Sequence, residues 1–205
     1  MSWQPPKPPF TSFKKTVFSK AGLVTDFVFQ IGEYLPLRQV SQEVNIEDIA
    51  TENFKEKLAY LKECLLKYRK LTGYGRGITA VQIGIPERFS VVYTPEELMV
   101  IINPTITKSS KTLLIYPEMC MSANPIIAPT TRPSWIEFNY YDEKGKLQHW
   151  DTKDETDMGR IMNRVFQHEI DHMEGIINID ITDPKTLILE SDPDFYKNAK
   201  FEEVT

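Results

Sequence analysis

Apolar side chains recur at three- and four-residue steps in two long segments, and this spacing predicts two helices. The first segment, residues 51–73, ends at Gly73, a residue that commonly stops a helix. Its apolar stripe consists of Phe54, Leu58, Leu61, Leu65 and Tyr68. The second segment, residues 156–173, is followed by Gly175. One face of this second helix carries Ile161, Val165, His168 and His172.

The chain between these helices has the alternating, β-branched and aromatic pattern of strands. Residues 89–94, 98–106 and 112–117 form three such runs, and residues 135–150 predict a hairpin that turns at Asp142–Gly145. Strands between two helices predict an α+β fold with small mixed or antiparallel sheets. We interpret Cys64, inside the first helix, as a small buried hydrophobic residue.

Composition places the chain among ordinary globular proteins. It has 205 residues, of which 41% are hydrophobic, and a net charge of −5. This length suits one domain, and the acidic balance gives no surface for direct nucleic-acid binding. No apolar run reaches the roughly 18 residues of a membrane helix, and two cysteines predict no disulfide framework. We therefore expect a cytoplasmic protein without a membrane partner, and we favour an organellar presequence less.

The first 30 residues differ in composition from the rest of the chain. They combine prolines, aromatic residues and lysines without periodicity, which predicts an extended N-terminal arm. Residues 31–182 would form the catalytic domain and residues 183–205 a C-terminal tail. We expect residues 1–30 to be dispensable for the metal site described next.

The segment FQHEIDHMEGI, residues 166–176, has a histidine spacing that is typical of a metal site. Residues four apart lie on one helix face, so His168 and His172 can direct two imidazole nitrogens to one divalent ion. Glu169 follows the first histidine and can reach a water on that ion, which is the arrangement of HExxH metalloenzymes. The third histidine, His149, lies alone on the predicted hairpin and is expected to have no ligand role.

The third protein ligand is open on spacing alone. A catalytic ion of this type usually has three protein ligands and one open position. A metallopeptidase would use a downstream carboxylate, for which Asp180, Asp183 and Glu190 are candidates. Cys120 is the other candidate, because a thiolate is a good ligand for a borderline-soft ion.

Three segments in series resemble those of the peptide deformylases. They are GRGITAVQ, residues 75–82, then EMCMS, residues 118–122, and QHEIDH, residues 167–172. Residues 34–44 look like the opening segment of that family, so the resemblance covers about residues 32–182. It implies small sheets packed around a central HExxH helix. It also implies hydrolysis of the N-formyl group of formyl-methionyl peptides on nascent proteins, with release of formate.

The resemblance assigns a role to each matching residue. Cys120, His168 and His172 would hold the metal, and Glu169 would act as general base. The side-chain amide of Gln82 and the backbone N–H of Met121 would stabilise the oxyanion. The substrate would lie along Gly75, Arg76, Gly77 and Glu118. Asp171 would lie behind the metal with Arg132 as its partner.

The family typically uses Fe²⁺, while Zn²⁺, Ni²⁺ or Co²⁺ would suit the same ligands. Four residues depart from the family pattern, all in or near the substrate segments: Arg76, Met119, Met121 and Ile127. The family's basic tail for ribosome docking is absent, since residues 181–205 hold more acidic than basic residues. Weak ribosome binding is therefore expected.

Three other functions compete with deformylation of nascent chains. The altered substrate segments leave open a metal amidase with a different substrate. A carboxylate as third ligand would favour an HExxH metallopeptidase instead. A non-catalytic deformylase-like protein would be expected to have lost a catalytic residue, but Gln82, Cys120, His168, Glu169 and His172 are all present.

Overall fold

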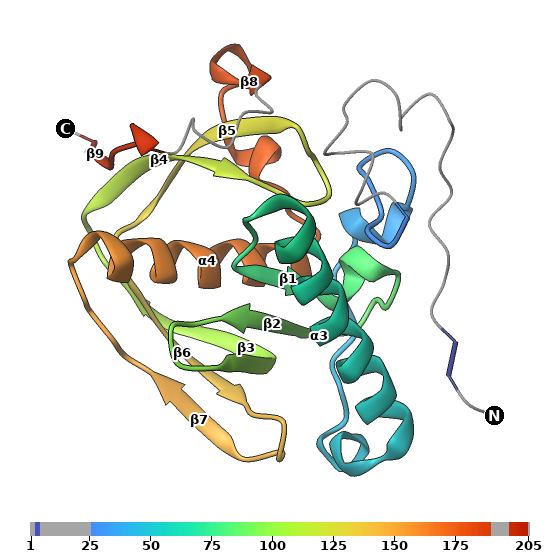
Figure 1. The fold of residues 1–205 in the computed structure, drawn as a ribbon. Coiled ribbons are helices and arrows are strands. Elements are labelled where there is room, and N and C mark those ends of the chain that lie inside the picture. Colours follow the sequence, from blue (N-terminus) through green and yellow to red (C-terminus); the bar gives the residue numbers. More distant parts are fainter. Residues whose placement is uncertain (1–2, 5–25, 190–196, 205) are drawn as a thin grey trace.

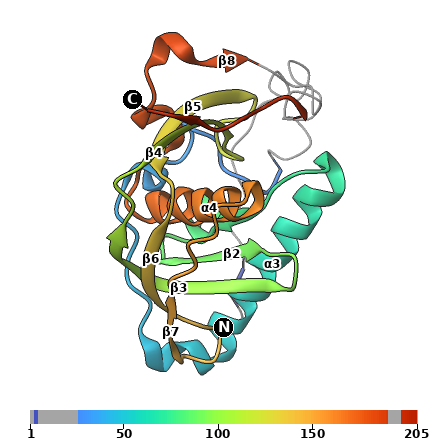
Figure 2. The same cartoon turned by 90° about the vertical axis from the view of Figure 1, so that its left-hand side faces the viewer.

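The fold is built around one helix that lies between two antiparallel sheets. The structure is a computed structural model that describes residues 3–4, 26–189 and 197–204. Helix α4 (Asp157–Met173) runs between the sheets in both views (Figures 1 and 2). The long helix α3 (Glu52–Thr72) packs beside this core. The predicted α+β class is confirmed.

The first sheet has five strands in the order β1-β2-β3-β6-β7, all antiparallel. Its strands are β1 (Gly77–Thr79), β2 (Phe89–Tyr93), β3 (Leu98–Ser109), β6 (Ile136–Tyr141) and β7 (Leu147–Trp150). Strand β1 lies at the edge of this sheet, and among the described strands it pairs with β2 alone. The predicted hairpin is β6–β7, and its turn residue Gly145 has φ of 73°.

The second sheet has the order β8-β5-β4-β9. It consists of β4 (Leu113–Met119), β5 (Ile126–Pro133), β8 (Ile188–Leu189) and β9 (Glu202–Glu203). Strands β4 and β5 pair over their whole length, from Leu113 with Pro133 to Met119 with Ile127. Cys120 follows the end of β4 directly, and its Sγ lies 3.2 Å from the Nε2 of His172 on α4.

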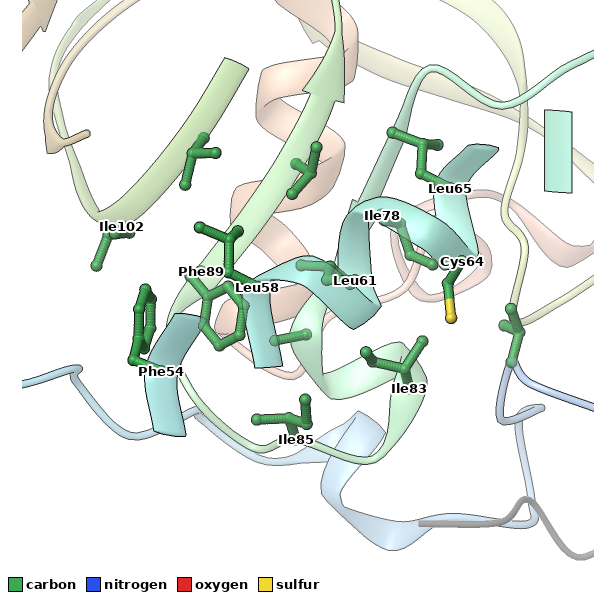
Figure 3. Packing of buried hydrophobic residues seen from close by; sticks show 14 of the residues in the cluster. Phe54, Leu58, Leu61, Cys64, Leu65, Ile78, Ile83, Ile85, Phe89 and Ile102 are labelled. Carbon is green, nitrogen blue, oxygen red and sulfur yellow. The ribbon is translucent and has the colours of Figure 1, made fainter. Parts of the chain in front are cut away.

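Helix α3 has the ends and the buried face that the sequence predicts. Thr51 caps it by accepting a hydrogen bond from the Phe54 N–H at 3.3 Å, and Gly73 ends it in the left-handed conformation. The whole predicted stripe and Cys64 are buried. Figure 3 shows the helix side chains from Phe54 to Leu65 close to those of Ile78 and Phe89, so α3 covers the first sheet near β1 and β2.

Helix α4 presents an apolar face to the first sheet and a polar face to the second. Its apolar residues Met162, Phe166 and Ile170 pack on the first sheet with Ile101 and Phe138. Its other face is polar yet buried, because it meets carbonyl groups of the second sheet. Arg164 donates to the carbonyls of Leu114 and Thr130, and Gln167 donates to that of Pro133. The histidines extend this buried polar face toward the C-terminus.

Four strands were not among the sequence predictions: β1, β5, and the two-residue strands β8 and β9. β1 has three residues and lies in a glycine-rich segment, and β5 contains Pro129 and Pro133, which weaken a strand pattern. Most of the expected N-terminal arm, and with it Phe10, Phe13 and Phe18, lies outside the described residues. Phe27, Val28 and Phe29, at the end of that arm, are buried in the core. Among the helices of the described ranges, none has the length and apolarity needed to cross a membrane.

Candidate metal centre

Three donor side chains converge where the second sheet meets α4. Cys120 follows β4 directly, and His168 and His172 lie one turn apart on the helix. One donor atom from each lies within 4.8 Å of the others. The Cys120 Sγ is 3.2 Å from the His172 Nε2, and both residues are fully buried. The structure therefore brings together the predicted Cys and His₂ set.

The donor atoms are oriented as a cation site requires. Glu118 occupies the Nδ1 of His168 at 3.0 Å, which leaves the Nε2 of that ring for a metal. Burial holds the pKa of His172 well below its ordinary value, which favours the neutral ring, the form that binds metals. Burial acts against the charge of His168, but contacts with Cys120 and Glu118 outweigh it and raise the pKa. The same negative surroundings favour a bound divalent ion.

Glu118 is the shared partner of three basic side chains. Its carboxylate accepts hydrogen bonds from Arg132 Nε and Arg164 Nη1, each at 2.6 Å. Burial opposes its ionisation, yet the charge of Arg132 and the bond to His168 hold the pKa below its ordinary value. Arg132 also binds Asp171 at 2.6 Å, so the predicted Asp171–Arg132 pair is confirmed. This network fixes the ring plane of His168.

Glu169 points to the other side of α4, toward β1. The Thr79 hydroxyl donates to its Oε2 at 2.6 Å, and burial raises the pKa of its carboxyl group. The side chain lies directly against the Cα of Gly77, where a Cβ would overlap it. A buried carboxylate with a raised pKa beside a metal site is suited to accept and return a proton.

Gln82 is held in one orientation. Its Oε1 accepts from the Thr79 N–H at 2.8 Å, so its Nε2 must face Ser122 Oγ at 3.2 Å and Cys120 Sγ at 3.8 Å. The amide therefore directs a donor into the site.

A short segment before the catalytic domain holds both predicted oxyanion donors in place. The Phe29 N–H donates to the Gln82 carbonyl at 2.8 Å, and the Gln30 Nε2 donates to the Met121 carbonyl at 3.1 Å. The backbones that carry the Gln82 amide and the Met121 N–H are thus tied to one short stretch of chain.

A cavity of about 410 Å³ opens onto these groups. All four predicted substrate residues, Gly75, Arg76, Gly77 and Glu118, line it, and so do Gln82, Met121, His168 and Glu169. The carboxylate of Glu118 is engaged with the basic network, and Gly75 has φ of 91°, which glycine adopts without strain. The cavity thus joins the candidate base, a donor amide and one of the metal ligands, His168.

A family model for polypeptide deformylases matches residues 28–187. The chain belongs to the peptide deformylase family. A peptide deformylase of Prochlorococcus marinus (strain NATL2A) is 29% identical over 178 residues, which are 84% of this chain and 81% of the relative. One of Synechocystis sp. is 33% identical over 57% of this chain and 62% of the relative.

Solved structures give the same result. The peptide deformylase of Thermotoga maritima is 26% identical, with a TM-score of 0.65 over 77% of this chain and 97% of that one. A probable peptide deformylase from Synechococcus phage S-SSM7 is 29% identical, with a TM-score of 0.62 over 75% and 97%. Peptide deformylases are metal-dependent hydrolases that remove the N-formyl group from nascent peptides, and family membership assigns this activity to the chain.

Three residues of the site were not singled out from the sequence. Thr79 binds both Glu169 and Gln82, and the pattern of a threonine three residues before a glutamine could have indicated this contact. Arg164 lies one turn before His168 on the same helix, which was a usable signal. Gln30 contacts the site from far away in the sequence, and no local pattern marks it.

Proposed function

We propose that this peptide deformylase uses Cys120, His168 and His172 to hold one Fe²⁺ ion and acts on formyl-methionyl peptides. The observation that supports the ligand set is the convergence of these three donors within 4.8 Å. A bound divalent ion would supply a Lewis acid and lower the pKa of a water at the open position. Zn²⁺, Ni²⁺ and Co²⁺ fit the same donors.

Glu169 is the proton carrier in this proposal. It takes a proton from the attacking water and later gives it to the leaving amine of methionine. Burial raises the pKa of its carboxyl group, which favours proton uptake, and the bond to Thr79 holds the carboxylate in one position; both support this role.

Gln82 and Met121 complete the proposed chemistry. Negative charge develops on the formyl oxygen as water attacks, and the Gln82 Nε2 and the Met121 N–H donate to it. The fixed orientation of the Gln82 amide supports this role, because a pre-aligned donor needs no reorganisation during the reaction.

The competing metallopeptidase hypothesis lacks its third ligand among the described residues. Asp180 binds Arg38 and the Ile177 N–H, and Asp183 accepts from the Lys185 N–H at 2.9 Å. Glu190 lies outside the described ranges. Cys120 is already within reach of both histidines, so the cysteine is the better third ligand.

The unusual residues of the substrate segments do not disturb the backbone. Met119 stands where the family has glycine, but among described non-glycine residues only Asn103 has a positive φ. Ile127 is buried and pairs with Met119 between β5 and β4. These changes alter side chains in the substrate region, whereas the proposed catalytic residues themselves are present in the sequence.

The partner and the compartment follow from the same proposal. A formyl-methionyl nascent chain is the substrate, and binding to the ribosome is weak because the acidic residues 181–205 offer no basic tail. The cytoplasm, where formylated chains emerge, is the proposed compartment.

The test is formate release by anaerobically prepared, Fe²⁺-loaded protein acting on formyl-Met-Ala-Ser. We expect Glu169→Gln to keep its metal and to lose turnover by about 10²- to 10⁴-fold. Cys120→Ser should lose metal as measured by plasma mass spectrometry. His149→Ala is the control, because this exposed histidine binds only Asn139 among the described residues. Wild-type turnover in Glu169→Gln would disprove the assignment of the base.

A further inference from the structure

Arg76 is a half-buried cation at the mouth of the cavity with no anionic partner among the described residues. Its side chain lines the cavity together with His168 and Glu169. No hydrogen bond or ion pair engages its guanidinium within the described ranges. Burial, and then the charge of Arg69, lowers its pKa. A charge in this position is stabilised by any anion that enters the cavity.

The other charged groups of the cavity wall are already engaged. Arg69 donates to the Gly75 carbonyl at 2.6 Å and stacks on Tyr93 at 3.6 Å. Arg164 is neutralised by Glu118 at 2.6 Å. Glu169, the second acid of the wall, is bonded to Thr79 on the inner side of Gly77. The uncompensated charge at the mouth is therefore positive.

The free edge of β1 gives a peptide a path past Arg76. Among the described strands β1 pairs with β2 alone, so its other edge can accept an extended peptide as an additional strand. The formyl end must lie at Glu169, beside Gly77. Ile78 and Thr79 are fully buried, whereas Gly75 and Arg76 are partly exposed, so the peptide leaves the site in the direction of Arg76.

We propose that Arg76 selects formyl-methionyl peptides that carry an acidic residue directly after methionine. An extended peptide advances about 3.3 Å per residue, so this side chain lies roughly 7 Å from the formyl group, within reach of a long arginine. Arginine binds carboxylates through a planar pair of N–H donors, which a glutamate can satisfy. The inference rests on the proposed function and names the substrate class of the same site.

The experiment compares formyl-Met-Glu-Ser, formyl-Met-Gln-Ser and formyl-Met-Lys-Ser in four metal-loaded proteins: wild type, Arg76→Gln, Arg76→Lys and Lys70→Gln. Lys70→Gln is the matched control, because it removes one positive charge from an exposed position outside the cavity. Wild type should prefer the glutamate over the lysine peptide about fivefold in kcat/KM, the size expected of one partly screened ion pair. The preference should weaken as salt is raised.

The variants decide the role of the guanidinium. Arg76→Gln should bring the ratio close to one, Arg76→Lys should keep part of the preference, and Lys70→Gln should keep all of it. Equal ratios in wild type and Arg76→Gln would overturn the inference while formate release still upholds the deformylase function. Failure of every peptide to release formate would instead overturn the function. In that case, calorimetry would compare how tightly wild type and Arg76→Gln bind the products Met-Glu-Ser and Met-Lys-Ser. An equal preference for Met-Glu-Ser in the two proteins would refute the inference.

Discussion

Gly77 shows how closely a single residue controls the catalytic group. It lies on β1 with an ordinary φ, so its conformation does not require glycine. The requirement is space, because a Cβ at this position would overlap the carboxylate of Glu169. The glycine therefore sets the distance between the edge strand and the proposed base.

We expect Gly77→Ala to lower kcat by about 10²-fold without loss of metal, because a displacement of a catalytic group by about 1 Å has this size of effect. Formate release per bound metal is the measurement. Gly159→Ala is the control, since its Cβ would also meet an acidic residue, Asp154, far from the cavity. That control should lose stability but keep its turnover per bound metal, and a loss of kcat equal to that of Gly77→Ala would contradict the explanation.

At the residue scale, the sequence predicted which residues carry the chemistry better than it predicted the contacts between them. The spacing of His168 and His172 predicted a shared ion because helix geometry alone brings them together. Cys120 needed the family resemblance, because its approach to α4 depends on how β4 pairs with β5. The contacts of Glu118 with two arginines depend on tertiary packing, so no local pattern could have predicted them.

At the scale of elements, α3 is stabilised by its buried stripe more than by its ends. Leu61 is fully buried at the centre of the cluster in Figure 3, whereas Leu66 on the opposite face is 46% exposed. The same substitution at the two positions therefore separates packing from helix propensity.

We expect Leu61→Ala to lower the free energy of unfolding by about 2–5 kcal/mol, because it removes buried methyl groups and leaves a cavity. Leu66→Ala should change it by less than about 0.5 kcal/mol. Urea unfolding followed by circular dichroism measures both. Similar losses in the two variants would show that the helix is not held by its buried face.

Elements with a strong period were predictable, and short or interrupted ones were not. Both helices appear within one or two residues of their expected ends because capping residues mark them. β1 is too short to show alternation, and the prolines of β5 make its local sequence look like a loop.

At the scale of the whole molecule, the site joins parts of the chain that are far apart in sequence. The second sheet supplies Cys120, α4 supplies the histidines, and the segment Phe27–Gln30 supports Gln82 and Met121 from outside. The predicted boundary at residue 30 stays a prediction, but these contacts favour a boundary before Asp26. The order of strands in the two sheets could not be predicted, because pairing partners are set by long-range packing.

We expect a protein that starts at Ile31 to be less stable than one that starts at Asp26 by about 5 kcal/mol, since three buried apolar side chains contribute roughly 1.5–3 kcal/mol each. Those side chains are Phe27, Val28 and Phe29. The urea midpoint of unfolding and formate release per bound metal should both fall, because Phe29 and Gln30 also hold the oxyanion donors. Equal unfolding midpoints would restore residue 30 as the boundary.

The shared carboxylate of Glu118 has a consequence for genetics. Arg132 binds this carboxylate, and the Asn178 Nδ2 donates to the Glu118 carbonyl at 3.1 Å, yet neither residue lines the cavity. In a saturation screen for growth, alleles at these two positions should therefore cluster with alleles of the metal ligands. Positions that tolerate no substitution would then include residues outside the cavity lining, because these residues hold Glu118 and the Glu118 carboxylate holds His168 in place.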